Sequence, residues 1–388
     1  QELLLAGLTK LEYRGYDSWG VGVAVDGRIE VQKETGKIST ASVDFPPTDI
    51  GFGHTRWATH GGVTRANAHP HLAESGTLAV IHNGIVENFR SLKEDLQQEG
   101  RSFASETDTE VIAHLLEREL QSGEEDSLRA FKRAFDQLDG LSAVIAMDLG
   151  SRSLIAAKNV SPLVIGRGAD GVTIASDALA LRGHASEIAY LEDGQLAHLS
   201  KDGVELFDGA TLDPVAIPWT VPDLEDRDLS LGDHPHFMAR EMHEQPDVIE
   251  RLAIDGEADI RALSRAILDS YGTFLVGCGT ASYAALSGVY LFSRIAAHHV
   301  NFSVGSEFKY HEHFLTPRSL VVALSQSGET ADVIESMIAA KGRGSRLGAL
   351  VNVPHSTLDR MVDVRVPLRA GPEQCVLSTK AYSAKVAA

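Results

Sequence analysis

Short apolar runs separated by turn residues dominate the first half of the chain. These runs have the length of β-strands, and glycine, aspartate or serine stands between several of them. Two longer stretches, residues 91–99 and 107–120, have the apolar spacing of amphipathic helices. Antiparallel strands with a few helices predict sheet layers covered by helices, an α+β fold. The predicted strands are residues 20–25, 51–55, 78–83, 142–148, 153–157, 163–166 and 172–175.

Two local signals refine this picture. Residues 191–196 carry Asp193 and Gly194 between apolar positions, which predicts a β-hairpin closed by a tight turn. Thr107 and Glu110 have the spacing of a capping box, so we expect the second helix to open there.

The pattern changes to alternating strands and helices from about residue 262. The clearest helical stretches are residues 280–297 and 329–341. This alternation predicts an α/β domain with a doubly wound parallel sheet, whose ligands bind at the carboxyl ends of the strands. The predicted strands are residues 273–276, 301–304, 320–324, 347–351 and 362–366.

Prolines and acidic residues interrupt the periodicity between these two halves. We interpret residues 207–261 as a linker and connecting helix, which leaves domains at residues 1–206 and 262–388. The chain begins at Gln1 inside a helix-like stretch and ends in another, so we expect it to be truncated at both ends.

Composition excludes several classes of protein. The net charge of −19 over 388 residues argues against a nucleic-acid partner, because phosphate backbones need basic patches. Two cysteines, Cys278 and Cys375, give no disulfide framework, which suits the cytoplasm. No stretch approaches the roughly 20 apolar residues of a membrane span.

A loop rich in hydroxyls, residues 325–330, follows the apolar run 320–324 and precedes a helix. A helix N-terminus with free N–H groups attracts an anion, and Ser325, Ser327 and Thr330 would add hydroxyl donors. The loop has no lysine, so a phosphate ester suits it better than a nucleotide triphosphate. A generic turn with an N-cap remains the alternative.

Polar residues follow two strands of the first half. Arg56 could grip a carboxylate bidentately, with Thr59 and His60 beside it, although it could also be a surface arginine. Asn83 and Gly84 form either a turn or an oxyanion hole built from the side-chain amide and the Gly84 N–H.

Other polar residues of the first half are open to two interpretations. Asp108 could recognise an ammonium group or interact with the helix dipole. The histidines could in principle hold a metal, but no ligand spacing supports one and we expect none; they are His54, His60, His69, His71 and His82.

Longer motifs resemble known families. Residues 11–18, 54–61, 67–71, 82–88 and 105–110 resemble a class II glutamine amidotransferase domain of the N-terminal-nucleophile type. Residues 278–280, 306–308, 325–332 and 378–381 resemble a sugar isomerase (SIS) domain. This order of domains is similar to that of the glutamine–fructose-6-phosphate aminotransferase family, over nearly the whole chain.

The resemblance implies roles in the first domain. Arg56, Thr59 and His60 would bind the glutamine carboxylate, Asp108 the ammonium, and Asn83 with Gly84 would form the oxyanion hole. Trp57 would lie in a loop that closes over glutamine. The family's nucleophile is an N-terminal cysteine, which this chain lacks, and neither Cys278 nor Cys375 can replace it.

The resemblance also implies a sugar-phosphate site in the second domain. The family usually has serine where this chain has Ala281, so Ser282 is the substitute we expect, although it points about 100° away along a helix. Cys375 and Leu377 also depart from the family. The acid–base residues of the isomerase would lie in a second SIS domain beyond Ala388. The implied contacts are Thr280, Ser282, Ser325, Gln326, Ser327, Thr330, Val376 and Ser378.

The implied activity converts fructose 6-phosphate and glutamine into glucosamine 6-phosphate and glutamate, the first step toward UDP-N-acetylglucosamine. The resemblance implies a cytoplasmic homodimer without metal or organic cofactor. Two alternatives are another class II amidotransferase, such as the phosphoribosyl-diphosphate type, and a non-catalytic sugar-phosphate-binding protein.

Overall fold

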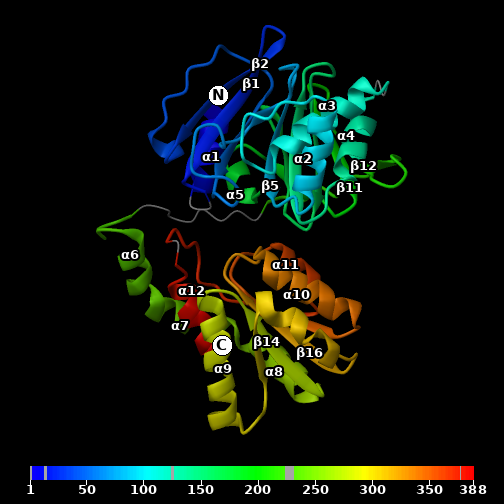
Figure 1. The fold of residues 1–388 in the computed structure, drawn as a ribbon. Helices are drawn as coiled ribbons and strands as arrows, with labels where there is room; N and C mark the ends of the chain where they lie inside the picture. Colours follow the sequence, from blue (N-terminus) through cyan, green and yellow to red (C-terminus); the bar gives the residue numbers. More distant parts are fainter. Residues whose placement is uncertain (1, 13–14, 124–125, 223–230, 376) are drawn as a thin grey trace. The chain divides into compact units, whose positions relative to one another are not determined.

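The chain divides into two units, Gln1–Glu225 and Asp226–Ala388, each with its own core. The computed structural model in Figure 1 describes residues 2–12, 15–123, 126–222, 231–375 and 377–388. The boundary between the two units, after residue 225, differs from the boundaries predicted at residues 206 and 262. The sheet of the first unit continues past residue 206, and the helices after residue 236 pack in the second unit.

Three antiparallel sheets form the first unit. One has the order β2-β1-β3, one β10-β8-β9, and the largest β13-β12-β11-β7-β6-β5-β4. The small sheets comprise β1 (Ser18–Val25), β2 (Arg28–Thr35), β3 (Gly51–Arg56), β8 (Val164–Gly168), β9 (Gly171–Ala175) and β10 (Glu187–Tyr190). The large sheet comprises β4 (His71–Leu72), β5 (Leu78–Gly84), β6 (Ser142–Asp148), β7 (Ser153–Asn159), β11 (Gln195–Ser200), β12 (Gly203–Asp208) and β13 (Pro214–Val215).

Helices cover the outer faces of these sheets. One core lies between the large sheet and α2 (Phe89–Gln98), α3 (Glu110–Gln121) and α4 (Ser127–Phe135), and a second lies between the large sheet and the small ones. On the other side, α1 (Glu2–Leu11) packs on β1, and α5 (Ala178–Leu181) packs on β8. The unit therefore has four layers: α1 and α5, the two small sheets, the large sheet, and α2 to α4. This arrangement confirms the α+β prediction.

Two local predictions for this unit are wrong. Asp193 and Gly194 do form a turn, in which the Gln195 N–H donates to the Glu192 oxygen at 3.2 Å. However, β10 pairs with β8 and β11 pairs with β7 and β12, so the turn connects two sheets rather than a hairpin. The capping box is absent because α3 begins at Glu110, whose carboxylate binds the N–H groups of Ala104 and Ser105.

The second unit contains a five-stranded parallel sheet in the order β15-β14-β16-β17-β18. All five strands were predicted to within two residues: β14 (Gly272–Gly277), β15 (Asn301–Val304), β16 (Ser319–Ser325), β17 (Arg346–Val351) and β18 (Val364–Pro367). Strand order reverses between β14 and β16, which is where doubly wound sheets bind ligands.

Helices surround this sheet, which confirms the α/β prediction. The predicted helix at residues 280–297 ends its α-helical part at Leu291 and continues as a π-helical turn, Phe292–Ala296. The helices are α6 (Phe237–His243), α7 (Gln245–Asp255), α8 (Glu257–Asp269), α9 (Thr280–Leu291), α10 (Ala331–Gly342), α11 (Thr357–Met361) and α12 (Lys380–Ala387).

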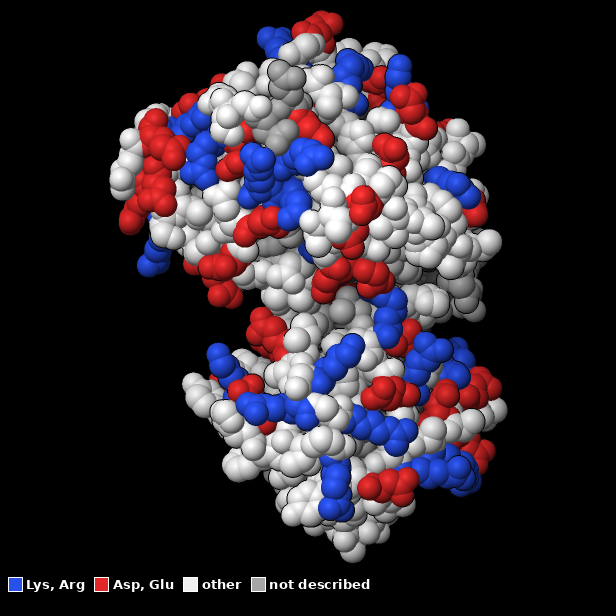
Figure 2. Space-filling view, turned by 90° about the vertical axis from the view of Figure 1, so that its right-hand side faces the viewer, with Lys and Arg blue, Asp and Glu red and all other residues white. Residues whose placement is uncertain are grey.

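Charged side chains of both signs are visible on the surface of each unit (Figure 2). Figure 2 shows acidic and basic side chains intermixed over one face of each unit, without a continuous basic surface in that view. Among the described residues, the helices are too short or too polar to cross a membrane.

Candidate functional site

Asn83 lies at the end of β5, where a half-buried histidine fixes its side chain. His54 Nε2 on β3 lies 2.9 Å from Asn83 Oδ1, and a carbonyl oxygen can only accept, so Nε2 donates. Burial lowers the pKa of His54 to about 4, so the ring is neutral near pH 7. With Oδ1 engaged, the amide N–H groups of Asn83 are left to face a ligand.

The Gly84 N–H is directed away from the neighbouring strand. The Ile85 N–H donates to the Leu141 oxygen at 3.1 Å, and hydrogen-bonded pairs alternate along an antiparallel ladder. Gly84 therefore forms a non-hydrogen-bonded pair with Ser142, and its N–H is not used by β6. Asn83 and Gly84 thus present two adjacent donors, as an oxyanion hole requires.

Arg56 ends β3 and folds back on the loop that follows it. Its guanidinium donates to the carbonyl oxygens of His60, of Gly61 at 3.5 Å and of Gly62 at 3.2 Å. Burial lowers the pKa of Arg56, and the nearby carboxylates of Asp108 and Asp17 oppose that shift. A guanidinium has five N–H donors, so donors remain for a ligand carboxylate.

Asp108 is buried and lies close to the residues just described. Its Oδ2 accepts the Val86 N–H at 2.8 Å, which joins it to the segment after Gly84. Asn67 joins its loop to the Arg56 loop: Nδ2 donates to the Gly62 oxygen at 3.0 Å, and Oδ1 accepts the Glu106 N–H at 2.9 Å. The candidate carboxylate and ammonium sites are therefore held together.

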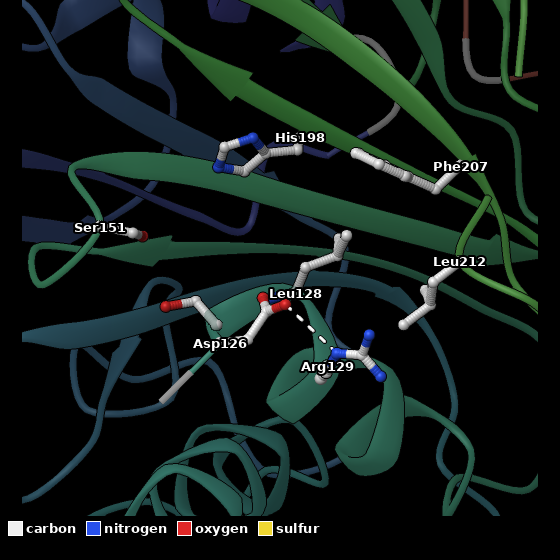
Figure 3. A pocket seen from close by; sticks show the side chains of 8 residues that line it. Asp126, Leu128, Arg129, Ser151, His198, Phe207 and Leu212 are labelled. Carbon is white, nitrogen blue, oxygen red and sulfur yellow. Dashed lines mark hydrogen bonds and ion pairs between the residues drawn. The ribbon is translucent and has the colours of Figure 1, made fainter. Parts of the chain in front are cut away.

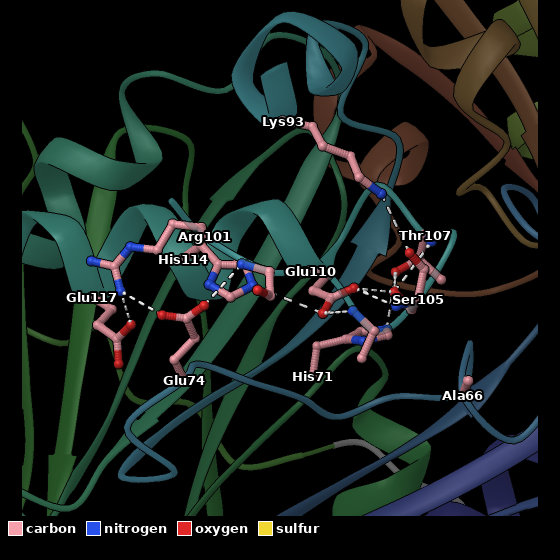
Figure 4. Close-up of polar contacts among 12 residues, drawn as sticks. Ala66, His71, Glu74, Lys93, Arg101, Ser105, Thr107, Glu110, His114 and Glu117 are labelled. Carbon is pink, nitrogen blue, oxygen red and sulfur yellow. Dashed lines mark hydrogen bonds and ion pairs between the residues drawn. The ribbon is translucent and has the colours of Figure 1, made fainter. Parts of the chain in front are cut away.

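A polar network around Glu110 fixes the loop before α3 (Figure 4). Glu110 accepts the N–H groups of Ala104 and Ser105, both at 2.7 Å, and the Ser105 hydroxyl at 2.6 Å. Burial alone would raise the pKa of Glu110, but contacts with His114, Ala104 and Ser105 lower it to about 2. The Thr107 hydroxyl lies 3.1 Å from His71 Nε2, which extends the network to β4.

The other predicted glutamine contacts surround this loop. Trp57 is 49% exposed, and its ring meets Tyr16 edge-on at 5.3 Å. The His60 ring meets Phe89 edge-on at 5.2 Å, and Thr59 is exposed. An exposed aromatic side chain beside the site is compatible with a covering loop, and the roles of these three residues stay predictions.

Four of the five histidines, His54, His69, His71 and His82, lie close together, and burial lowers the pKa of each. Burial lowers the pKa of His82 to about 4 and that of His71 to about 3, and it lowers the pKa of His69 well below 6.5. His82 contacts the hydroxyls of Thr109 at 3.1 Å and Ser142 at 3.2 Å. Among the described residues, no three histidine, cysteine or acidic side chains are arranged to bind a metal ion.

The hydroxyl loop of the second unit follows β16 at the switch point. Ser325 Oγ accepts the Gly328 N–H at 2.9 Å, and Ser327 Oγ accepts the Glu329 N–H at 3.1 Å. Because each hydroxyl acts here as acceptor, its own hydrogen stays available to donate. Thr330 is the N-cap of α10 and makes no side-chain capping bond. The loop therefore presents hydroxyl donors at a helix N-terminus, which suits a phosphate.

Neighbouring loops approach the same edge of the sheet. Cys278 Sγ, after β14, lies 3.9 Å from Asp332 Oδ2 in the first turn of α10. Gln326 accepts the Val353 N–H at 3.2 Å, and Asn352 bonds the Ala370 N–H at 2.9 Å and the Gly371 oxygen at 2.7 Å. The loops after β14, β16, β17 and β18 are thus connected.

The remaining predicted sugar contacts differ in burial and in hydrogen bonding. The Ser282 hydroxyl donates to the Gly279 oxygen at 2.7 Å, so a phosphate contact would require that bond to break. Thr280 is half-buried at the start of α9 beside Ala281, and Leu377 is 55% exposed. Ser378 Oγ is buried and has no hydrogen-bond partner among the described residues. Val376 lies outside the described residues.

A cavity of about 410 Å³ lies elsewhere in the first unit (Figure 3). Its walls come from the start of α4 and from β11 and β12, and an ion pair joins Asp126 to Arg129 at 3.4 Å. It contains none of the predicted site residues, and we assign it no ligand.

Sequence reasoning missed the supporting roles of three residues. His54 orients Asn83, Asn67 joins two loops, and Glu110 fixes the loop before Asp108. His54 and Asn67 fall inside motifs that resemble the amidotransferase domain, which was the available signal. The contacts themselves join residues far apart in sequence, which local patterns do not reveal.

Known protein families match a part of each unit. A glutamine amidotransferase domain matches residues 54–183, and a SIS domain matches residues 267–388. Among solved structures, glutamine phosphoribosylpyrophosphate amidotransferase from B. subtilis covers 94% of this chain at 18% identity, with 83% of its own chain covered and a TM-score of 0.47.

Curated relatives named glutamine–fructose-6-phosphate aminotransferase align with nearly the whole chain. The protein from Thermus thermophilus is 40% identical over 402 residues, which cover 100% of this chain and 65% of the relative. The protein from Bartonella quintana is 42% identical over 395 residues, covering 99% of this chain and 64% of the relative. The chain thus spans about 65% of the length of such relatives.

Proposed function

Because the chain belongs over its whole length to the glutamine–fructose-6-phosphate aminotransferase family, we propose that it acts in the synthesis of glucosamine 6-phosphate from fructose 6-phosphate and glutamine. The main support for this proposal is that one chain contains both a candidate glutamine site and a candidate phosphate site. One gathers Arg56, Asp108, Asn83 and Gly84, and the other is the hydroxyl loop at the switch point.

In the first unit, we propose that glutamine binds through its α-carboxylate to Arg56 and through its ammonium to Asp108. Its side-chain amide oxygen would face the Asn83 amide and the Gly84 N–H. These donors would stabilise the negative charge that develops when a thiolate attacks the amide carbon. Ammonia would leave and a thioester would form, which water then hydrolyses to glutamate. In the family, an N-terminal cysteine supplies the thiolate.

In the second unit, we propose that the phosphate of fructose 6-phosphate binds the hydroxyls of Ser325, Ser327 and Thr330 together with the N-terminus of α10. Gln326, Thr280 and Ser378 would contact the ester or the sugar. We further propose a cytoplasmic homodimer that acts at the entry to UDP-N-acetylglucosamine synthesis. Both cysteines are free, and α9 exposes Tyr283 and Tyr290, each 65% exposed, on a surface that a second copy could cover.

Replacing Ser327 with alanine is expected to weaken fructose 6-phosphate binding by about tenfold or more, because a hydrogen bond to a charged oxygen is lost. Calorimetric titration of this chain measures the effect. Ser264→Ala, on α8, is the matched control, since that hydroxyl bonds only within its helix to Ile260. Failure of the wild-type chain to prefer fructose 6-phosphate over phosphoribosyl diphosphate would contradict the proposed substrate.

Replacing Arg56 with lysine is expected to weaken glutamine binding by about tenfold or more. Lysine lacks the planar fork that holds three carbonyl oxygens and a carboxylate together. Binding of glutamine followed by NMR measures the loss. Arg152→Lys is the control, because Arg152 forms an exposed ion pair with Asp49. Equal affinity in Arg56→Lys and wild type would exclude Arg56 from the glutamine site.

A further inference from the structure

A buried carboxylate of α6 binds the loop between β18 and α12. Glu241 is 2% exposed, and its oxygens receive three hydrogen bonds from residues on both sides of position 376. Oε1 accepts the N–H groups of Gln374 at 2.7 Å and Cys375 at 2.9 Å. Oε2 accepts the Thr379 hydroxyl at 2.5 Å. These contacts therefore join residues that lie 133 or more positions apart in the sequence.

A second carboxylate completes the anchoring from within the loop. Glu373 Oε1 accepts the N–H groups of Thr379 at 2.9 Å and Ala381 at 3.0 Å, which fixes the start of α12. In contrast, Ser378 Oγ is buried but has no hydrogen-bond partner among the described residues. The carboxylates therefore hold the backbone on either side of Ser378 without using its hydroxyl.

We propose that Glu241 is a positioning residue for the sugar-binding loop, because it fixes the backbone that presents Ser378 to the substrate. The inference rests on the proposed function, in which Ser378 contacts fructose 6-phosphate. Glu241 has no contact with the hydroxyl loop at residues 325–330 among its described hydrogen bonds. Its effect should therefore fall on recognition of the sugar rather than on recognition of the phosphate.

The chemistry of the three donors explains why a carboxylate is required. Two backbone N–H groups and one hydroxyl point at the side chain, and an ionised carboxylate offers acceptors on both oxygens. In Glu241→Gln, the charge that strengthens all three hydrogen bonds is lost, and the amide NH₂ group either faces two N–H donors or forces the Thr379 hydroxyl to reverse and accept. The loop would lose part of its anchoring while the shape of the side chain stays nearly unchanged.

The test compares fructose 6-phosphate with inorganic phosphate by calorimetric titration of the full chain. Glu241→Gln is expected to bind fructose 6-phosphate about tenfold more weakly, the equivalent of one lost hydrogen bond of the charged type, and to bind inorganic phosphate as wild type does. Thr379→Val removes one of the donors and should produce a smaller loss in the same direction. It keeps the test usable if Glu241→Gln does not fold.

Glu244→Gln is the matched control. It carries the same charge change at the end of the same helix, but Glu244 pairs with the side chains of Arg240 and Lys380 rather than with the loop backbone. It is expected to retain its preference for fructose 6-phosphate. Equal losses for both ligands in Glu241→Gln, or no loss for either, would overturn the inference. If wild type binds no fructose 6-phosphate, the proposed function itself fails.

Discussion

Replacing Gly84 with alanine is expected to destabilise the first unit by about 3 kcal/mol or more and to disrupt the proposed oxyanion hole. Gly84 has a φ of +130°, a region that other residues rarely adopt. An added Cβ would lie 1.9 Å from the Leu141 oxygen and 2.9 Å from its carbonyl carbon, so the strand ends must separate. The site loses its geometry because Asn83 is adjacent.

Denaturation followed by tryptophan fluorescence measures this loss. All three tryptophans, Trp19, Trp57 and Trp219, lie in the first unit, so the signal reports that unit alone. Gly27→Ala is the control, since Gly27 also has positive φ, +79°, but an added Cβ meets nothing within 4 Å. Similar stabilities for Gly84→Ala and Gly27→Ala would show that backbone strain alone, without the clash, determines the effect.

Acidification below pH 6.5 is expected to destabilise the first unit. The pKa values of His54 and His82 fall from 6.5 to about 4 because burial disfavours the charged ring, and that of His71 falls to about 3. The unfolded chain then binds more protons than the folded chain below pH 6.5. The free energy of unfolding keeps its full value above pH 6.5 and falls as the pH approaches 4. Each such histidine lowers it by about 2 kcal/mol at pH 5.

Glu110 also lowers the free energy of unfolding on acidification, but it does so at a lower pH than the histidines. Its pKa of about 2 in the folded state lies below the ordinary value of 4.5, so its contribution is present above about pH 4.5 and disappears as the pH approaches 2. Tryptophan fluorescence against pH measures the transition. His198→Gln is the control, because His198 is half-buried on β11, outside the cluster. A constant signal from pH 7 to 4.5 would contradict the prediction.

The strands that sequence predicts best are those buried on both faces. Strand β6 coincides with the predicted residues 142–148, because Val144 and Ala146 face one core while Ala143 and Ile145 face the other. Strand β2 was missed because its sequence, Arg28–Thr35, is mostly polar and lies at a sheet edge. An apolar run in the sequence indicates a core strand. A polar edge strand has no such pattern and can be recognised only from its pairing with a neighbouring strand.

Pairing and anchoring lay beyond local patterns. The Asp193-Gly194 signal correctly predicted a turn, but the partner of each flanking strand is set by packing between sheets. The spacing of Thr107 and Glu110 suggested a cap, yet Glu110 satisfies backbone groups earlier in its loop. Glu241 fell within the predicted linker because its partners come more than a hundred residues later. The predicted ligand contacts rest on the family resemblance and stay predictions, whereas the hydrogen bonds that support them join residues far apart in sequence.

The turn after β17 carries no predicted ligand, yet Val353 bonds Gln326 and Asn352 bonds Ala370 and Gly371. A change in the length of this turn would therefore displace the hydroxyl loop at residues 325–330 and the loop between β18 and α12 together. Relatives should therefore keep the length of the turn after β17 constant, although none of the predicted ligand contacts lies in it.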